Sequence, residues 1–271
     1  MPELPEVETT RLGILPHVLG RRVTEVIVRR WDLRWPVSED LPLIEGGCFT
    51  SVERRSKYLL LGMEAGYTVL IHLGMSGSLR IVPDGEEWRK HDHIGITLEG
   101  GMQLRYHDPR RFGLVFRVAN SDLAGHPLLR QLGPEPLGES FTGKYLHSAL
   151  RKKTIPLKVA LMDAKIVVGV GNIYASESLF RAGIHPATPA DKLTKRKAET
   201  LVAAIKDVLI ESITQGGTTL RDFLKSDGQP GYFAQRLFVY GRKGEPCRVC
   251  GTLISHQVMA QRATFWCASC Q

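Results

Sequence analysis

The sequence contains no long apolar run, and none of its hydrophobic segments approaches the ~20 residues that a helix needs to cross a bilayer. The first residues, MPELPEVE, are acidic and contain two prolines, so they have neither the basic nor the apolar segment of a secretory signal. Internal repeats and low-complexity blocks are also missing. These absences exclude a helical membrane protein and predict a cytoplasmic protein with no membrane partner.

Cysteine is scarce, with five residues in 271. Four of them form two Cys-x-x-Cys pairs near the end of the chain, and Cys48 stands apart from them. This spacing is typical of metal binding in a reducing compartment rather than of a disulfide framework. We expect Cys48 to be a small buried apolar residue.

Acidic residues are outnumbered by basic ones, because 28 Asp and Glu oppose 36 Lys and Arg and leave a formal net charge of +8. The sequence pI is about 9.3. This balance suits a polyanionic partner such as nucleic acid, although charge alone does not identify one. With 43% hydrophobic residues the chain can build a real core, and its length fits two domains or one domain plus a small appendage.

The first half of the chain is organised as short β-type runs separated by turns. The opening residues predict a helix that begins near Pro2, kinks at Pro16 and ends at Gly20. The runs that follow predict a sandwich of seven or eight strands. They cover Arg21–Arg30, Tyr58–Met63, Tyr67–Leu73, Ser78–Val82, Ile94–Leu98, Met102–Tyr106 and Gly113–Val118.

The pattern becomes helical after Pro134-Glu135-Pro136. Apolar residues at spacings of three and four predict helices over Leu157–Lys165, Ile173–Ala182 and Thr194–Ile213. A stretch rich in Gly, Asp, Ser and Pro at 217–234 predicts a loop. The expected fold class is therefore α+β multidomain, with domains at 1–131, 132–236 and 237–271.

The most specific local motif is Cys247-x-x-Cys250 followed, after sixteen residues, by Cys267-x-x-Cys270. The spacing predicts four thiolates around one tetrahedral Zn²⁺, with the intervening chain forming a hairpin. An iron or redox site is the alternative. Four Cys ligands leave no open position on the metal, so we expect a structural ion. Arg262, near the expected hairpin tip, is either a phosphate ligand or a solvated surface residue.

Pro2 is a candidate nucleophile, because removal of Met1 would leave it with a free secondary amine that can attack an aldehyde carbon and form an iminium. A reference α-amino pKa of about 8 leaves on the order of a tenth of such an amine neutral at pH 7. The alternative is that Pro2, followed by Glu3 and Glu6, is simply a good helix start. The residues alone leave both interpretations open.

Two further segments suit a protein that inserts side chains into a base stack. Asp108–Gly113, DPRRFG, combines a proline turn, two guanidinium groups and an aromatic ring, and Met75 lies within His72–Gly77, HLGMSG. Apolar and planar side chains can fill the gap that an extruded nucleotide leaves. The alternative for Met75 and Phe112 is an ordinary place in the core.

Other residues suit contacts with phosphate. Gly169–Asn172, GVGN, precedes a predicted helix, and its N–H groups can bind phosphate or simply cap that helix. Lys57, the run 151–153 and Lys158 add positive charge that would give salt-dependent affinity. His91-Asp92-His93 could suggest a metal site, but the sequence offers no further ligand near it. We therefore favour a role in hydrogen bonding or in phosphate binding.

Taken together, these motifs closely resemble those of bacterial formamidopyrimidine-DNA glycosylases, and the match runs from end to end. It rests on Pro2–Glu8, His72–Gly77, Asp108–Gly113, Gly169–Ser176 and the four-cysteine hairpin. The sister endonuclease VIII, which acts on oxidised pyrimidines, usually has Gly where Leu4 stands here. A non-catalytic zinc-ribbon DNA-binding protein is a further alternative, but it gives no reason for an unblocked Pro-Glu start.

The resemblance implies an eight-stranded β-sandwich preceded by a catalytic N-terminal helix, a helix-two-turn-helix domain and a C-terminal zinc-finger hairpin, with DNA between the domains. It also implies base-excision repair of oxidised purines such as 8-oxoguanine and formamidopyrimidines, by base flipping followed by AP lyase β,δ-elimination. The implied partner is double-stranded DNA with oxidised bases or abasic sites. We expect a monomer in the bacterial cytoplasm, associated with the nucleoid through DNA.

The resemblance also assigns residue roles. Pro2 would attack C1′ and Glu3 would supply the acid and base steps. Lys57 and Arg262 would bind phosphate and serve strand cleavage, although an arginine is a poor acid. Met75, Arg110 and Phe112 would fill the gap and contact the orphaned cytosine, while His91, Lys153, Asn172 and Tyr240 would hold backbone. Lys152 or Lys158 can replace Lys153 in this scheme, and Thr218, Thr219 and Arg221 are candidates for reading oxidised guanine.

Overall fold

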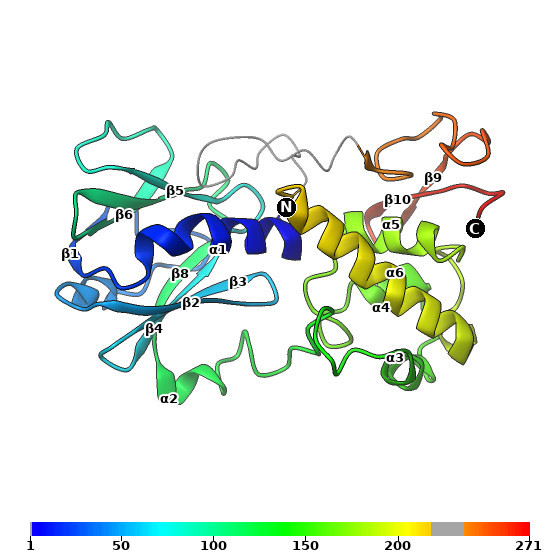
Figure 1. Cartoon of the computed structure of the whole chain (residues 1–271), viewed down its shortest axis with the longest axis horizontal. Helices are drawn as coiled ribbons and strands as arrows, with labels where there is room; N and C mark the ends of the chain where they lie inside the picture. Colours follow the sequence, from blue (N-terminus) through cyan, green and yellow to red (C-terminus); the bar gives the residue numbers. More distant parts are fainter. Residues whose placement is uncertain (1, 218–235) are drawn as a thin grey trace. The chain divides into compact units, whose positions relative to one another are not determined.

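The computed structural model describes residues 2–217 and 236–271 (Figure 1). Its contacts divide this part of the chain into two compact units. The first, called here the sandwich unit, comprises residues up to 130 together with 215–217. The second, the helical unit, comprises 131–214 together with 236–271. The loop residues Thr218, Thr219 and Arg221 lie outside the described residues.

Helix α1 spans Leu4–Val18 and packs against the sandwich (Figure 1). Glu3 is its N-cap, and the Glu3 N–H donates to Glu6 Oε2 at 2.8 Å. The expected start at Pro2 is therefore wrong by two residues, because the backbone of Glu3 is still extended. The helix continues through Pro16 and ends at Val18, and it buries Leu4, Val7, Ile14 and Val18.

Two four-stranded antiparallel sheets form the sandwich unit, with strand orders β1-β6-β7-β5 and β2-β3-β4-β8. The predicted sandwich is confirmed. Its strands are β1 (Val23–Val28), β2 (Phe49–Arg55), β3 (Tyr58–Met63), β4 (Tyr67–His72), β5 (Ser78–Pro83), β6 (Asp92–Leu98), β7 (Met102–His107) and β8 (Leu114–Ala119). A short 3-10 helix, η1 (Leu41–Ile44), precedes β2, and α2 (Asn120–Leu123) follows β8.

The core of this unit lies between the two sheets and under α1. Strand β3 shows the simplest pattern, because alternate residues are buried and Leu59 and Leu61 reach the core. Val7 and Ile14 of α1 belong to the same cluster. Cys48 does not, and the expectation that it is buried is wrong: it is half-buried. It precedes the edge strand β2 and pairs with Arg22 only through an isolated bridge.

The helical unit contains α3 (Gly143–Leu150), α4 (Leu157–Leu161), α5 (Asn172–Arg181), the 3-10 helix η2 (Ala190–Lys192) and α6 (Lys195–Thr214). The predicted helices α5 and α6 are confirmed to within one residue at each end, whereas α4 stops before the predicted Lys165. The hairpin of β9 (Ser255–Met259) and β10 (Arg262–Trp266) completes the unit. None of the helices in the described ranges is both long and apolar enough to span a membrane.

Candidate DNA-binding and active site

The start of the chain places a prospective amine beside two buried carboxyl groups. Pro2 directly precedes the N-cap of α1 and is buried. Glu3 and Glu6 each expose 2% of their surface. Gly217, where the predicted loop 217–234 begins, packs against Glu6: a Cβ at Gly217 would lie 3.4 Å from Glu6 Cγ. The predicted nucleophile and the predicted acid–base residue are thus neighbours at one end of α1.

Lys57 lies in the turn between β2 and β3, and this turn is linked to α1 through charged side chains. Glu8 accepts hydrogen bonds from Arg11 Nη2 at 2.7 Å and from Arg54 Nε at 3.0 Å. Arg54 also donates to the Ser56 carbonyl at 2.9 Å, and Ser56 adopts a left-handed backbone with φ +58°. The position of the Lys57 turn is therefore fixed relative to the start of α1.

His72 ends β4 and is neutral near pH 7. Its Nδ1 accepts the Gly74 N–H at 3.0 Å, and its ring lies 4.9 Å from that of Tyr58. Burial lowers the pKa of His72 from 6.5 to about 4, and the charge of Lys57 acts in the same direction, while Asp108 opposes both. A neutral imidazole is needed here because only the unprotonated Nδ1 can accept the Gly74 hydrogen.

This depressed pKa predicts a loss of stability in mild acid. Because the folded-state pKa lies below the unfolded value of 6.5, the stabilisation is present above pH 6.5 and is lost as the pH falls towards 4. Between pH 7 and pH 5 the free energy of unfolding should fall by about 2 kcal/mol from this group. Urea titrations of the wild type and of His72→Asn, which keeps an acceptor but does not titrate, measure the difference. Equal pH dependence of the two proteins would contradict the prediction, and substitution of the exposed His17 is the control.

The two predicted probe segments lie against each other in the sandwich unit. A Cβ at Gly74 would come within 2.5 Å of Gly113 N, so the backbones of the loops 73–77 and 108–113 touch. Met75 is half-buried, whereas Arg110 is exposed and Phe112 exposes 36% of its surface. The guanidinium of Arg110 lies 5.1 Å from the Phe112 ring centroid. An exposed aromatic ring with a cation beside it can stack on a base.

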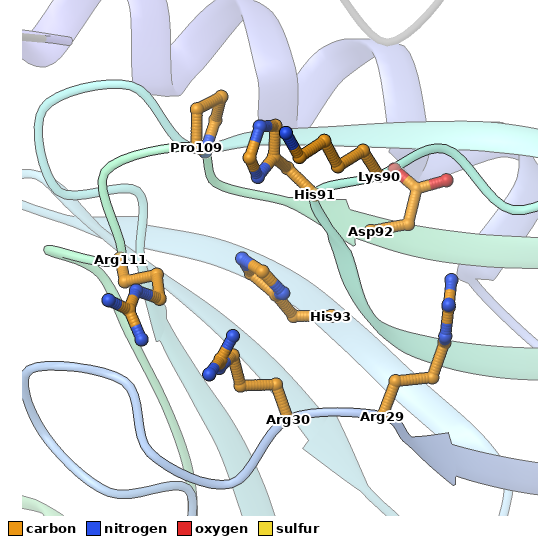
Figure 2. A pocket seen from close by; sticks show the side chains of 8 residues that line it. All are labelled: Arg29, Arg30, Lys90, His91, Asp92, His93, Pro109 and Arg111. Atoms are coloured by element: carbon orange, nitrogen blue, oxygen red, sulfur yellow. The ribbon is translucent and has the colours of Figure 1, made fainter.

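A basic pocket of about 340 Å³ lies where β1 ends and β6 begins (Figure 2). Figure 2 shows the side chains of Arg30, His93 and Arg111 around one space, with His91 and Pro109 nearby. The other lining residues are Arg29, Lys90 and Asp92. The pocket therefore brings predicted His91 together with three arginines, two of which, Arg29 and Arg30, sequence reasoning missed.

The single carboxylate of this pocket does not offset its cations, because it is already paired. Both carboxylate oxygens of Asp92 accept hydrogen bonds from Arg80 Nη2, at 2.8 and 2.9 Å. Oδ1 also lies 2.8 Å from His107 Nδ1, in hydrogen-bond contact. Burial alone would raise the pKa of Asp92, but the bonds from His107, the Arg89 N–H and Arg80 hold it well below its usual range. Two arginines of the pocket, Arg30 and Arg111, are paired with the exposed Asp32 at 2.8 and 3.4 Å. The remaining charge, on Arg29 and Lys90, favours an anion such as phosphate.

In the helical unit, the residue after Arg262 is held by two side chains. The Ala263 carbonyl accepts Lys158 Nζ at 2.9 Å and Asn172 Nδ2 at 3.0 Å. Lys158 also donates to Thr264 Oγ1 at 2.7 Å and exposes only 1% of its surface. Among the lysine alternatives, Lys158 therefore supports the hairpin from inside the protein. Lys153 is half-exposed and lies 3.7 Å from the Asp163 carboxylate.

The tip of the hairpin is a two-residue turn in which Ala260 and Gln261 both have positive φ, at 45° and 61°. Positive φ at both central residues gives the twist that a tight hairpin needs. Arg262 follows the turn, is exposed, and borders a pocket of about 210 Å³ that α4 also lines. The structure thus places the predicted phosphate ligand directly after the turn, at the first position of β10.

Tyr240 is positioned by Glu177, a residue that sequence reasoning missed. Glu177 is fully buried on α5 and accepts the N–H groups of Phe238, Val239 and Tyr240 at 2.8, 3.0 and 2.9 Å. Burial raises the pKa of Glu177, and these three bonds act against that rise. A charged residue within the buried apolar face of α5 was the available signal. It ties the segment before the cysteines to the helix.

The four cysteines converge. All four Sγ atoms lie within 4.8 Å of one another, with Cys247 to Cys270 at 3.9 Å and Cys250 to Cys267 at 3.4 Å. Tetrahedral Zn–S bonds of about 2.3 Å require sulfur separations of about 3.8 Å. The cysteines are therefore positioned to bind one metal ion, as predicted. Within residues 2–217 and 236–271 this is the group suited to a metal, and His91 and Asp92 are not part of one.

Three protein-family models match successive parts of the chain. They are the formamidopyrimidine-DNA glycosylase N-terminal domain over 1–115, its H2TH domain over 132–224, and a zinc finger found in FPG and IleRS over 244–271. The chain belongs to the formamidopyrimidine-DNA glycosylase family. The family's protein from Escherichia coli O6:H1 is 57% identical over 271 residues, with all of both chains covered. This membership confirms the resemblance seen in the sequence.

Solved structures from this family agree over the whole chain. The Fpg (MutM) protein of Thermus thermophilus is 43% identical, with a TM-score of 0.90 over 100% of this chain and 98% of that one. Lactococcus lactis Fpg is 32% identical in complexes with Fapy-dG DNA, with abasic-site DNA and with an oxidised-pyrimidine DNA. Their TM-scores are 0.92, 0.91 and 0.91, and each covers at least 99% of both chains.

Proposed function

We propose that this chain excises oxidised purines from duplex DNA and cleaves the resulting abasic site, with Pro2 as the nucleophile. As a member of its family the chain is a base-excision repair DNA glycosylase with AP lyase activity. The observation that carries the proposal for this chain's own residues is the start of α1, where Pro2 adjoins two carboxyl groups that are buried. The proposed domains are 1–131, 132–236 and 237–271.

In the proposed reaction the lone pair of the Pro2 nitrogen bonds to C1′ while the glycosidic bond breaks. The base leaves with the electrons of that bond and takes up the proton that the Pro2 nitrogen loses. The C1′–O4′ bond also breaks, and O4′ takes a proton from Glu3, which leaves an iminium between Pro2 and the sugar. Glu3, now a carboxylate, then removes a C2′ proton, which expels the 3′ phosphate, and loss of a C4′ proton to the same carboxylate, after it passes its proton to water, expels the 5′ phosphate. Water releases the sugar fragment and restores Pro2.

The remaining site residues are proposed to hold the duplex. Lys57 and Arg262 would bind the phosphates at the lesion. Met75, Arg110 and Phe112 would fill the gap left by the flipped nucleotide, which offsets lost stacking of a few kcal/mol. His91 and the arginines around its pocket would bind backbone, as would Lys153, Asn172 and Tyr240. The four thiolates would hold one Zn²⁺ and leave no position for substrate, so the metal fixes the hairpin.

The proposed partner is double-stranded DNA with oxidised bases or abasic sites, bound by a monomer associated with the nucleoid in the cytoplasm. The net charge of +8 and the basic pocket support a DNA partner. A preference for oxidised pyrimidines is the second candidate, because a relative at 32% identity has been solved with such DNA. The two candidates share their chemistry and differ in the lesion that they take.

A panel of duplexes tests the proposal. We expect single-turnover excision of 8-oxoguanine or a formamidopyrimidine opposite cytosine to be at least tenfold faster than excision of an oxidised pyrimidine opposite its usual partner. Both flanking phosphates should be released, which gel mobility of end-labelled strands detects. Faster excision of the pyrimidine would favour the second candidate. Binding of every duplex without incision would overturn both and leave a non-catalytic DNA-binding protein.

A further inference from the structure

A buried hydrogen-bond network joins the two probe loops of the sandwich unit. Ser76 lies on the loop 73–77, beside Met75, and Asp108 begins the loop that carries Arg110 and Phe112. Ser76 Oγ donates to Asp108 Oδ1 at 2.7 Å and accepts the Arg110 N–H at 3.1 Å. Ser76 exposes 3% of its surface and Asp108 none. One hydroxyl thus bridges both loops out of contact with water.

Asp108 extends this network to the rest of its own loop. Its Oδ2 accepts the Gly113 N–H at 2.9 Å and the Tyr106 hydroxyl at 3.0 Å. The first and last residues of the loop 108–113 are therefore tied together by one carboxylate. The residues between them include Arg111, which has a left-handed backbone with φ +59°. Buried bonds to a charged group are the stronger kind and hold such a conformation in place.

The backbone of Asp108 reaches the basic pocket as well. Its carbonyl accepts the Nε2–H of buried His93 at 2.8 Å, and its N–H donates to the His91 carbonyl at 3.0 Å. Asp108 therefore contacts three segments proposed to touch DNA: the Met75 loop, the Phe112 loop and the turn at His91 that precedes β6. The side chains that make these contacts, those of Ser76, Tyr106 and His93, are buried.

We propose that Ser76 and Asp108 are positioning residues that fix the separation of the two probe loops, so that Met75 and Phe112 enter the base stack as one rigid unit. This inference rests on the proposed function. Filling the gap left by a flipped nucleotide requires both side chains at set depths, and an error of about 1 Å in positioning is costly. The single bridging hydroxyl of Ser76 fixes the relative position of the two side chains without placing another polar group in the base stack.

Ser76→Ala tests the proposal, because it removes the bridge and adds no bulk. We expect kcat/KM on a duplex with 8-oxoguanine opposite cytosine to fall on the order of tenfold. Cleavage of a single-stranded oligonucleotide with an abasic site should stay within about twofold, because it has no opposite base and no gap to fill. A 2-aminopurine next to the lesion should also report weaker unstacking when the variant binds.

The matched control is Ser121→Ala, which removes an exposed serine hydroxyl bonded to Asp122 at 3.1 Å in the same unit. It should leave both substrates unaffected. Tyr106→Phe breaks one bond to Asp108 without severing the bridge between the loops, and we expect at most about a threefold effect on the duplex. If Ser76→Ala and Tyr106→Phe lose the same fraction of activity on the duplex, the number of bonds to buried Asp108 matters and the bridge between the loops does not, which would overturn the inference.

Other outcomes separate this inference from the proposed function. If the wild type cuts both substrates and Ser76→Ala matches it on both, the inference alone fails. Equal losses on duplex and single strand would indicate damaged folding and would also overturn it. Where Ser76→Ala does not fold, Asp108→Asn keeps one acceptor oxygen and should show the same duplex-selective loss. If the wild type cuts neither substrate, the proposed function fails, and the inference fails with it.

Discussion

Replacing Pro2 by Gly should abolish most strand cutting while the variant still binds lesion-containing duplex. The change removes the secondary amine, which can form an iminium without losing a second proton, and substitutes a primary amine with a looser backbone. Loss of a covalent nucleophile typically lowers kcat by ~10³-fold or more. Single-turnover excision and fluorescence anisotropy, measured on the same 8-oxoguanine duplex, separate the chemical step from binding.

Two measurements make the Pro2 prediction specific. Pro5→Ala alters the first turn of α1 without touching the terminal amine, so it should retain most activity. Borohydride reduction during turnover should attach the sugar to the N-terminal peptide, which mass mapping locates. Attachment to an internal lysine, or full activity in a preparation whose terminus is acylated, would exclude Pro2 as the nucleophile.

The sandwich was predictable because its strands carry simple periodic patterns. Strand β3 alternates buried and half-buried residues, which is the signature of one face on a core. Strand β2 was missed because Phe49–Arg55 is largely charged and polar, with only Phe49 and Val52 buried. An edge strand needs few apolar residues, so its sequence resembles a loop. Helix α3 was missed for a related reason, since eight residues give barely two turns of periodicity.

The residues of the candidate site were likewise predictable only where a local sequence pattern reveals them. Motifs that are contiguous in sequence, such as the Pro-Glu start and the Cys-x-x-Cys pairs, were visible because the spacing itself encodes the chemistry. The basic pocket was only half visible, because Arg29 and Arg30 follow β1 while His91 precedes β6, and pairing of these two strands brings them together. Glu177 was missed, and Asp108 was noticed only as the start of a turn, because the role of a buried carboxylate is recognised by its partners, which lie far along the chain.

Removal of zinc should be the second large effect, and it should act on DNA affinity rather than on the chemistry at Pro2. The core around the cysteines is small: its buried members are Phe180, Val239, Cys247, Ile254, Phe265 and Cys267. Two of these are metal ligands, so this core is incomplete without the ion. Structural zinc contributes about 10–16 kcal/mol in isolated finger peptides, far more than such a core supplies.

Without the metal, β9 and β10 should lose their fixed geometry, and Arg262 should lose its place. Lys158 and Asn172 hold β10 only at Ala263 and Thr264, and these bonds do not fix the other strand of the hairpin. Losing one or two charge-assisted phosphate contacts corresponds to a Kd that rises by about 10- to 100-fold. Anisotropy titrations of Cys250→Ser and of chelator-treated protein, with zinc content measured in parallel, should show this rise.

Cys48→Ser is the matched control for the zinc prediction, because it removes a half-buried thiol in the other unit. It should keep the full zinc content and the wild-type Kd. The contrast matters because a general sensitivity to thiol loss would weaken both cysteine variants alike. A zinc-free protein that still bound DNA with wild-type affinity would contradict the prediction, since the hairpin would then be dispensable for holding phosphate. Cleavage of a single-stranded abasic site by such a protein would place the remaining activity in the sandwich unit, where Pro2 and Glu3 lie.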